Sequence, residues 1–152
     1  MADLTIHHID DSTARELPYA DGGVKAGFPS PAQEYMDCAI DLNRDLVRHP
    51  ESTFYARVEG DSMEEAGVSE GDILVVDKLL EVHDGDMAVC VINGEFTVKF
   101  VEFHDDSVTL WPANPAYAPI TVAEGDRFDV WGVVTYVIHR VHRRPHDRSH
   151  RL

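Results

Sequence analysis

The sequence predicts a mainly β protein: a small antiparallel β-barrel or pair of packed sheets, with a flexible N-terminal arm and one short helix. Two observations predict this class. Short runs of β-branched and aromatic residues recur between residues 53 and 138, with turn-forming residues between them. Two of these runs are separated only by Asn93 and Gly94, and such an Asn-Gly pair is the strongest short-range sign of a β-hairpin.

The N-terminal third of the chain is expected to hold the arm and the helix. Residues 18–29 are rich in glycine and proline, which is typical of an extended, flexible segment. A helix is expected to begin at Ser30, a favourable N-cap that is followed by proline. Apolar residues near helical spacing continue to Val47, and the pair His49 and Pro50 ends the segment.

From residue 53 onward the chain is expected to form successive antiparallel strands. Gly-Asp pairs precede several of them, and turn chemistry accounts for these pairs, because glycine permits the bend and aspartate bonds back to the backbone. The expected strands are residues 54–58, 73–76, 87–92, 95–101, 108–111, 120–122 and 128–138. We therefore divide the 152 residues into an arm with its helix (1–50), a β domain (51–140) and a basic, disordered tail (141–152).

The charge is distributed unevenly, and this restricts the classes of partner. The formal net charge is −15, and residues 1–138 hold 8 Lys and Arg against 27 Asp and Glu. Such a body argues against a face that grips duplex phosphates, so no sequence-specific DNA binding is expected. The last 14 residues hold five arginines and four histidines, which we interpret as a solvated tail rather than a metal site.

Cysteine content and hydropathy indicate the compartment. Cys38 and Cys90 are too few for a disulfide framework, and we interpret Cys90 as a packed thiol. No stretch approaches the ~20 apolar residues of a membrane-spanning helix. The N-terminus lacks the basic start and apolar run of a secretory signal. We expect a cytoplasmic protein without a cofactor and without membrane contact.

The predicted hairpin assigns Lys99 to one face of the sheet. A two-residue loop pairs Ala88 with Lys99, and residues opposite each other share a face. The apolar side chains of both strands, such as Val89 and Val98, then form the core face. Lys99 lies on the other face beside small side chains, where another segment has room to cover it. The competing interpretation is an ordinary solvated lysine.

Ser62 lies in a predicted tight turn with the sequence Gly-Asp-Ser-Met, 37 positions before Lys99. A serine in such a turn and a lysine in an apolar strand are the parts of a Ser-Lys hydrolase, which needs no catalytic histidine. The lysine must be neutral to take a proton, so its pKa of ~10.4 has to fall by about three units in a dry site. Amides around Ser62 and Met63 would form the oxyanion hole. The competing interpretation of Ser62 is a polar turn residue.

Several separated motifs, in the same order, resemble the LexA/UmuD family of self-cleaving serine peptidases (S24). Those shared with the family as a whole are residues 58–63 (VEGDSM), 67–77 (GVSEGDILVVD) and 94–99 (GEFTVK). Those that resemble its UmuD branch are residues 26–32, 40–43, 114–121 and 128–134. The resemblance covers roughly residues 24–138 and implies a fold like the C-terminal domain of LexA.

The resemblance also implies a function. It implies that Ser62 is the nucleophile, that Lys99 is the general base, and that the scissile bond joins Ala26 to Gly27. It implies slow self-cleavage that a RecA filament on single-stranded DNA stimulates. The trimmed chain would then act as a homodimeric subunit of an error-prone translesion DNA polymerase, with a UmuC-type Y-family polymerase as partner.

Three alternatives remain open at this stage. In the first, the chain is a dimeric module that binds polymerase or RecA without cutting itself. In the second, it is a LexA-like self-cleaving regulator without a DNA-binding domain. The third alternative, a type I signal peptidase, also uses a Ser-Met turn and a strand lysine, but it needs a membrane anchor. About 26 residues precede the expected cut, too few for a helix-turn-helix domain, so we favour the UmuD-like interpretation.

Overall fold

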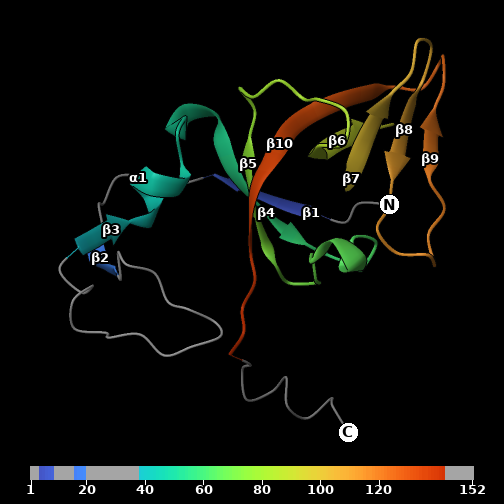
Figure 1. The fold of residues 1–152 in the computed structure, drawn as a ribbon. Helices are drawn as coiled ribbons and strands as arrows, with labels where there is room; N and C mark the ends of the chain where they lie inside the picture. The colour runs from blue at the N-terminus through green and yellow to red at the C-terminus, as the bar shows by residue number, and fades with distance from the viewer. Residues whose placement is uncertain (1–3, 9–15, 20–37, 143–152) are drawn as a thin grey trace, which may run out of the picture.

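The computed structural model describes residues 4–8, 16–19 and 38–142. Eight antiparallel strands form one sheet in the order β1-β4-β5-β10-β6-β7-β8-β9, which confirms the mainly β, antiparallel prediction (Figure 1). The strands of this sheet are β1 (Leu4–His8), β4 (Thr53–Val58), β5 (Ile73–Asp77), β6 (Met87–Ile92), β7 (Glu95–Phe103), β8 (Val108–Trp111), β9 (Ile120–Val122) and β10 (Phe128–Ile138).

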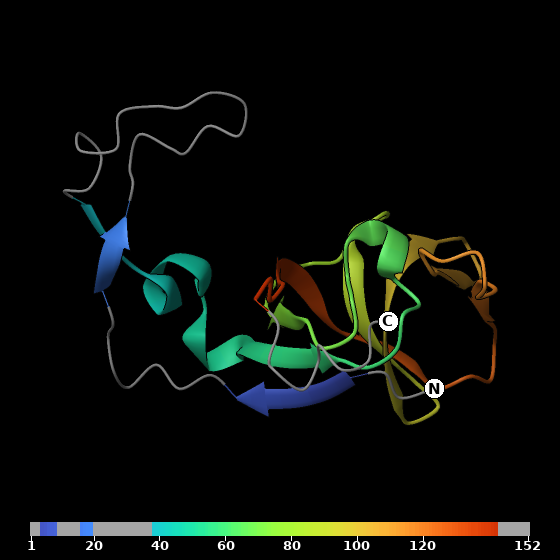
Figure 2. The same ribbon diagram turned by 90° about the horizontal axis from the view of Figure 1, so that it is seen from below.

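The remaining elements are small. Strands β2 (Glu16–Tyr19) and β3 (Cys38–Asp41) form a separate two-stranded sheet, and β3 leads directly into the helix α1 (Leu42–Leu46). Two short 3₁₀ helices, η2 (Pro50–Ser52) and η3 (Glu64–Ala66), flank β4 along the chain. In Figure 2 the small sheet lies to one side of the main sheet, next to α1.

The main sheet is curled, and it has buried clusters of apolar side chains. The first cluster draws on β1, β4, β5, β6 and β7, and the second on β6, β7, β8 and β9. The first consists of Leu4, Ala56, Val58, Met63, Val68, Leu74, Val76, Val89 and Val98. The second consists of Ala88, Cys90, Ile92, Val101, Leu110 and Val122. Consecutive residues of β6 and β7 therefore alternate between the two clusters, as the period of two of a strand requires.

The register of the β6–β7 hairpin is as predicted. Ile92 pairs with Glu95 next to the turn, and Ala88 pairs with Lys99 farther along. Asn93 and Gly94 have φ angles of 51° and 85°. Two consecutive positive φ angles are characteristic of the type I′ turn, which Asn-Gly adopts at low cost and which matches the twist of the two strands.

Strand β10 connects the two halves of the sheet. Its first half pairs with β6 and its second half with β5, and the register shifts in both ladders. Gly132 lies at the closest approach: a Cβ atom there would be 2.5 Å from Cγ1 of Val76 and 3.3 Å from the carbonyl oxygen of Asp77. Only glycine allows this spacing, because Val76 is fully buried and has no room to move.

Two buried aspartates lie at the ends of β5, Asp72 just before the strand and Asp77 as its last residue, and each one bonds a histidine from another part of the chain. The Asp72 carboxylate is 2.6 Å from Nδ1 of His139, beyond the end of β10, and the Asp77 carboxylate is 2.6 Å from Nδ1 of His49, before η2. His139, one of the four histidines near the C-terminus, thus contacts the β domain through Asp72 while its side chain stays 56% exposed. Of that tail, the structure describes residues only as far as His142.

The N-terminal third differs from the sequence prediction. Residues 38–41 form β3, whereas the sequence predicts them within a helix that begins at Ser30, and the helix α1 is confined to Leu42–Leu46. The apolar spacing of this short segment fits a strand as well as a helix, and the partner strand Glu16–Tyr19 settles the choice. Residues 4–8, expected in the arm, are part of the main sheet. Ser30 and the rest of the expected helix start lie outside the described residues.

Candidate active site

The Ser62 turn lies between β4 and β5. It begins at Gly60, whose φ angle of 88° favours glycine, and it continues into η3. Met63, the next residue after Ser62, is 1% exposed and belongs to the first apolar cluster. The Met63 carbonyl oxygen accepts hydrogen bonds from the amides of Ala66 and Val68. A buried neighbour and a closed turn therefore hold the serine in one position.

Lys99 reaches Ser62 from the middle of β7. Its Nζ atom lies 2.9 Å from Oγ of Ser62, 2.7 Å from Oγ1 of Thr97 and 3.0 Å from the carbonyl oxygen of Val98. Lys99 is only 4% exposed, and Thr97 is fully buried. The structure thus brings together the two side chains that the sequence singled out, and it surrounds the buried amine with oxygen atoms.

The face on which Lys99 lies is drier than the hairpin alone indicates. Lys99 is on the opposite face from Val98, as the register predicts. The sequence suggests an outer face that another segment covers, but that face carries the second apolar cluster, to which Ala88 and Cys90 belong. Cys90 is fully buried in this cluster, which agrees with its interpretation as a packed side chain.

The loop after β8 braces the Ser62 turn. The Ala113 amide donates to the Ser62 carbonyl oxygen at 2.8 Å, and the Glu65 amide donates to the Ala113 carbonyl oxygen at 2.8 Å. Asn114 donates from Nδ2 to the Asp61 carbonyl oxygen at 3.0 Å. Sequence reasoning missed this bracing, because residues 114–121 entered it only as a matching motif.

A second link between the same two segments joins side chains. The Tyr117 hydroxyl donates to Oδ1 of Asp61 at 2.5 Å. The residue before the serine is thus bonded through its backbone by Asn114 and through its side chain by Tyr117. Together these bonds restrict the rotation of the turn that presents Ser62.

The backbone amides of Ser62 and Met63 are available for a ligand. Among the residues that the structure describes, neither amide donates a hydrogen bond. Available donors beside a nucleophile are the requirement for an oxyanion hole. The sequence-predicted cleavage residues, Ala26 and Gly27, lie outside the described residues, so their position relative to Ser62 stays a prediction.

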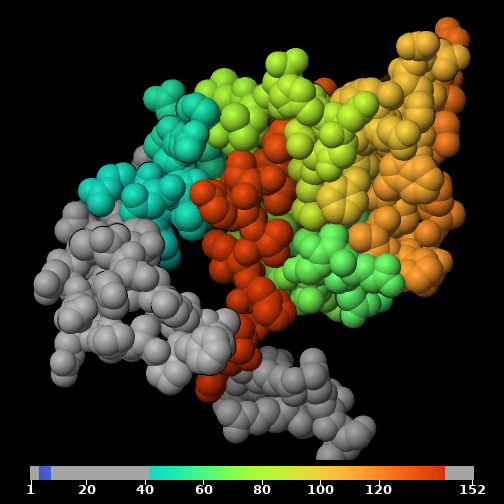
Figure 3. All heavy atoms as spheres, in the orientation of Figure 1, coloured from blue at the N-terminus to red at the C-terminus, as the bar shows by residue number. Residues whose placement is uncertain are grey.

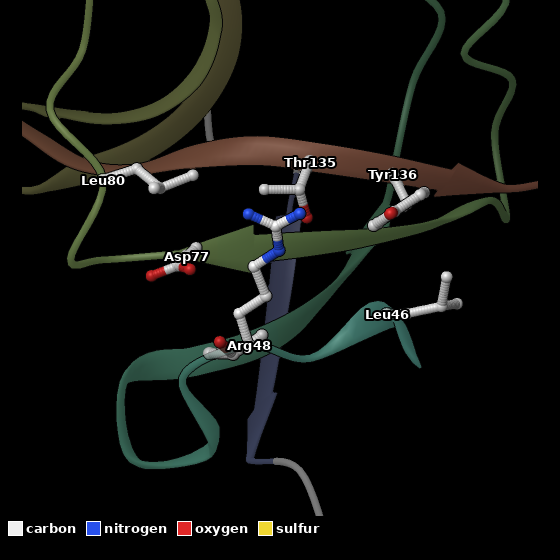
Figure 4. Close-up of a pocket in the computed structure, with 7 residues that line it drawn as sticks. Leu46, Arg48, Asp77, Leu80, Thr135 and Tyr136 are labelled. Atoms are coloured by element: carbon white, nitrogen blue, oxygen red, sulfur yellow. The ribbon is translucent and has the colours of Figure 1, made fainter. Parts of the chain in front are cut away.

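A separate pocket of about 230 Å³ lies away from this pair, between α1, β5 and β10. Figure 4 shows the Arg48 side chain reaching across β5 toward Thr135. Neither Ser62 nor Lys99 lines it; the residues that do are Leu46, Arg48, Thr53, Asp77, Leu80, Thr135 and Tyr136. Within the described part of the chain, no three His, Cys, Asp or Glu side chains gather as a metal site would require, and no helix is long and apolar enough to cross a membrane.

Known proteins are similar to this chain over most of its length. Protein SamA of Salmonella typhimurium is 43% identical over 115 residues, which cover 76% of this chain and 79% of SamA. Protein ImpA of Escherichia coli is 41% identical over 137 residues, 86% of this chain and 88% of ImpA. Protein MucA of Escherichia coli is 38% identical over 127 residues, 82% of this chain and 86% of MucA.

A match to a protein family covers most of the chain. Residues 18–135 match the sequence pattern described as Peptidase S24-like. The matched range includes the Ser62 turn, the bracing loop and Lys99. The chain therefore belongs to the peptidase S24-like family, whose UmuD-like members it resembles.

Proposed function

We propose that the chain is a UmuD-like protein of SOS mutagenesis that cuts itself once, between Ala26 and Gly27, with Ser62 as nucleophile and Lys99 as general base. The observation that carries the proposal is the 2.9 Å contact between Nζ of Lys99 and Oγ of Ser62. A serine hydroxyl is a weak nucleophile unless an adjacent base accepts its proton, and Lys99 is the base within hydrogen-bond reach.

The chemistry takes place in two steps. In its neutral form the Lys99 amine accepts the hydroxyl proton as Oγ of Ser62 attacks the Ala26 carbonyl carbon. The tetrahedral intermediate collapses, the bond to the Gly27 nitrogen breaks, and the Lys99 ammonium returns the proton to that nitrogen. A water molecule then hydrolyses the ester between Ser62 and Ala26, with Lys99 again as the base, and the free serine is restored.

The surroundings of Lys99 support the role of a base. Burial disfavours the charged form of an amine, and Lys99 is 4% exposed. Thr97 and the Val98 carbonyl oxygen orient Nζ toward Ser62. The amides of Ser62 and Met63 would stabilise the oxyanion of the intermediate, since donors aimed at developing charge are worth about 2.7–4 kcal/mol each in such sites.

The proposed substrate is the arm itself. Gly27 has no Cβ, so the serine can approach the scissile carbonyl with little steric hindrance. The described chain resumes at Cys38, and 35 positions separate Gly27 from Ser62. This length permits cutting within one chain or between the two chains of a dimer. Under this proposal the peptidase domain spans residues 51–140, and β1, from the arm, adds one edge strand to its sheet.

The trimmed chain is proposed to act as a homodimer. The second half of β10 supports this. Beyond Val133, the edge of β10 that faces away from β5 pairs with no strand of the described chain. Tyr136, Val137 and Ile138, in this half of β10, are 37–45% exposed. Figure 3 shows the end of β10, in red, at the surface of the molecule. An apolar strand edge of this kind favours pairing with another chain. Sedimentation of the Tyr136→Asp variant tests this, and a dimer as tight as that of the unaltered protein contradicts it.

Two further partners belong to the proposal. A RecA filament on single-stranded DNA stimulates the cut, and the trimmed dimer becomes a subunit of an error-prone translesion polymerase with a UmuC-type Y-family enzyme. Co-elution of such a polymerase with the trimmed dimer, but not with the uncut Ser62→Ala protein, is the expected result. Equal co-elution of both forms contradicts the role of trimming in this assembly.

The central experiment is intact mass spectrometry of the full chain. The protein is incubated in neutral and mildly alkaline buffer, with and without RecA, single-stranded DNA and a nucleotide. Two fragments divided after Ala26 are expected, more of them at alkaline pH, because more of the Lys99 amine is neutral. The matched control Lys78→Ala, which removes an exposed lysine, should cut normally.

Two outcomes contradict the proposal. Cutting that persists in Ser62→Ala would exclude the serine mechanism. A chain that stays intact under every condition would instead favour the binding module that does not cut itself.

A further inference from the structure

Strand β1 lies before the proposed cut, yet it is an edge strand of the main sheet. Residues 4–8 pair with β4 in antiparallel register, from Leu4 opposite Val58 to His8 opposite Phe54. Figures 1 and 2 both show β1 alongside β4. Cleavage after Ala26 would break the covalent link between this strand and the sheet that it completes.

The side chains of β1 alternate between the core and solvent. Leu4 is 8% exposed and belongs to the first apolar cluster, and Ile6 packs against the same cluster. They lie opposite Val58 and Ala56, which are buried in that cluster. Thr5 points outward, and its hydroxyl donates to Oε1 of Glu59 at 2.9 Å. The edge of β4 thus offers a ladder of backbone groups, two apolar positions and one carboxylate.

A second strand also precedes the cut and pairs with a segment that follows it. β2 (Glu16–Tyr19) precedes Ala26 and pairs with β3 (Cys38–Asp41), which follows it. A fragment of residues 1–26 would therefore keep two strand pairings with the rest of the protein after its peptide bond is broken. Two weak contacts on one peptide hold it more strongly than either alone.

We propose that the edge of β4 is a reversible binding site for an extended peptide, and that its first occupant is residues 4–8 of this chain. This rests on the proposed cut at Ala26, after which cutting and release are two separate events. While the arm is intact, β1 binds within one molecule at an effective concentration in the mM range. After the cut, binding is bimolecular, and the fragment leaves on dilution.

Release would change what the trimmed protein can bind. The vacated edge exposes unpaired N–H and C=O groups of β4 and the apolar position that Leu4 occupied, which are the requirements for strand addition by another peptide. The ligand chemistry follows from the contacts of β1. The site takes an extended segment with apolar side chains two residues apart and a hydrogen-bond donor between them that reaches Glu59.

The test separates release from self-cleavage. Residues 24–29 of a full-length Ser62→Ala protein are replaced by the recognition sequence of a site-specific protease, which then makes the cut. The cut protein is analysed by gel filtration and intact mass at high and low concentration. The N-terminal fragment is expected to co-elute with the main chain at high concentration and to be lost on dilution. Failure of the Ser62 mechanism leaves this result unaffected.

Competition with synthetic peptides tests the site. A peptide of residues 1–19, which carries both strands, should displace the fragment, and its His7→Asp variant should do so equally well, because His7 is exposed. The Ile6→Asp variant should be weaker by about tenfold or more, since it places a charge against the apolar cluster. Each change is made in the peptide, so the fold of the protein is not at risk. Immediate loss of the fragment at every concentration, or equal displacement by both variants, would overturn the proposal.

Discussion

The Nζ atom of Lys99 lies 2.9 Å from the Oγ atom of Ser62, although the two residues are 37 positions apart. β7 supplies the lysine and the turn after β4 supplies the serine. The two elements meet because Met63 and Val98, their immediate neighbours, are buried in the same apolar cluster. Packing of these neighbours thus sets the distance between the two reactive groups.

Lys99→Met separates the chemistry of this contact from its structural role. The substitution keeps a long apolar stem and removes the amine, so self-cleavage should be abolished at every pH. The melting temperature should stay the same or rise, because an apolar group replaces a buried polar one. Intact mass and thermal unfolding measure the two effects, and residual cutting at alkaline pH would show that another base operates.

Thr97→Val tests the orientation of the amine. The hydroxyl of Thr97 is 2.7 Å from Nζ of Lys99, and the loss of one such hydrogen bond should slow self-cleavage about tenfold. Thr97→Ser keeps the hydroxyl and should restore most of the rate. Cleavage time courses on gels give both rates, and a valine variant that cuts at the normal rate would remove Thr97 from the mechanism.

Asn114→Ala tests the bracing loop. The substitution removes the bond from Nδ2 to the Asp61 carbonyl oxygen, and one neutral hydrogen bond of about 1 kcal/mol corresponds to roughly fivefold slower self-cleavage. Thr121→Ala, at an exposed position on β9, is the matched control and should cut normally. If both variants cut equally fast, the loop does not position the serine.

Gly132→Ala tests the close approach of β10 to β5. The added methyl group would meet Val76 and the Asp77 backbone, and such overpacking should lower the free energy of unfolding by about 1–3 kcal/mol. Ser107→Ala, in the turn before β8, should change it by less than about 0.5 kcal/mol. Urea denaturation compares the two variants. An unchanged midpoint for Gly132→Ala would mean that the sheet adjusts without cost.

Tyr55 is expected to contribute to the loss of stability at alkaline pH. Burial raises the pKa of the Tyr55 hydroxyl above its ordinary value of 10.0. As the pH rises, the unfolded chain therefore loses this proton before the folded chain does. The contribution of the Tyr55 hydroxyl to stability is complete below its ordinary pKa, and it is lost as the pH rises through the pKa of the folded state. In Tyr55→Phe, the melting temperature should fall less steeply above about pH 10. Equal slopes would show that other groups control alkaline unfolding.

Local chemistry makes the hairpin predictable. Asn93 and Gly94 favour one type of turn, a two-residue turn allows one register, and the register decides the face of every residue on both strands. The position of Lys99 opposite Ala88 therefore follows from the hairpin sequence alone. The serine turn is recognisable for a similar reason, because glycine precedes it at a position where φ is positive.

The N-terminal strands are not predictable in this way. Leu4, Thr5, Ile6 and His7 alternate between apolar and polar, but four residues are too short a pattern, and their partner lies about 50 positions away. Residues 38–41 likewise become a strand only because a distant segment pairs with them. Long-range pairing is a property of the whole chain, so no local window contains it.

The turn that presents Ser62 and the face that carries Lys99 can both be derived from the residues next to them in the chain. The contact between these two side chains, the second apolar cluster that keeps the face of Lys99 dry and the bracing of the turn by Asn114 are visible only in the folded molecule. Turns and strand registers arise from neighbouring residues. Distance and dryness arise from the packing of segments that are far apart in the chain.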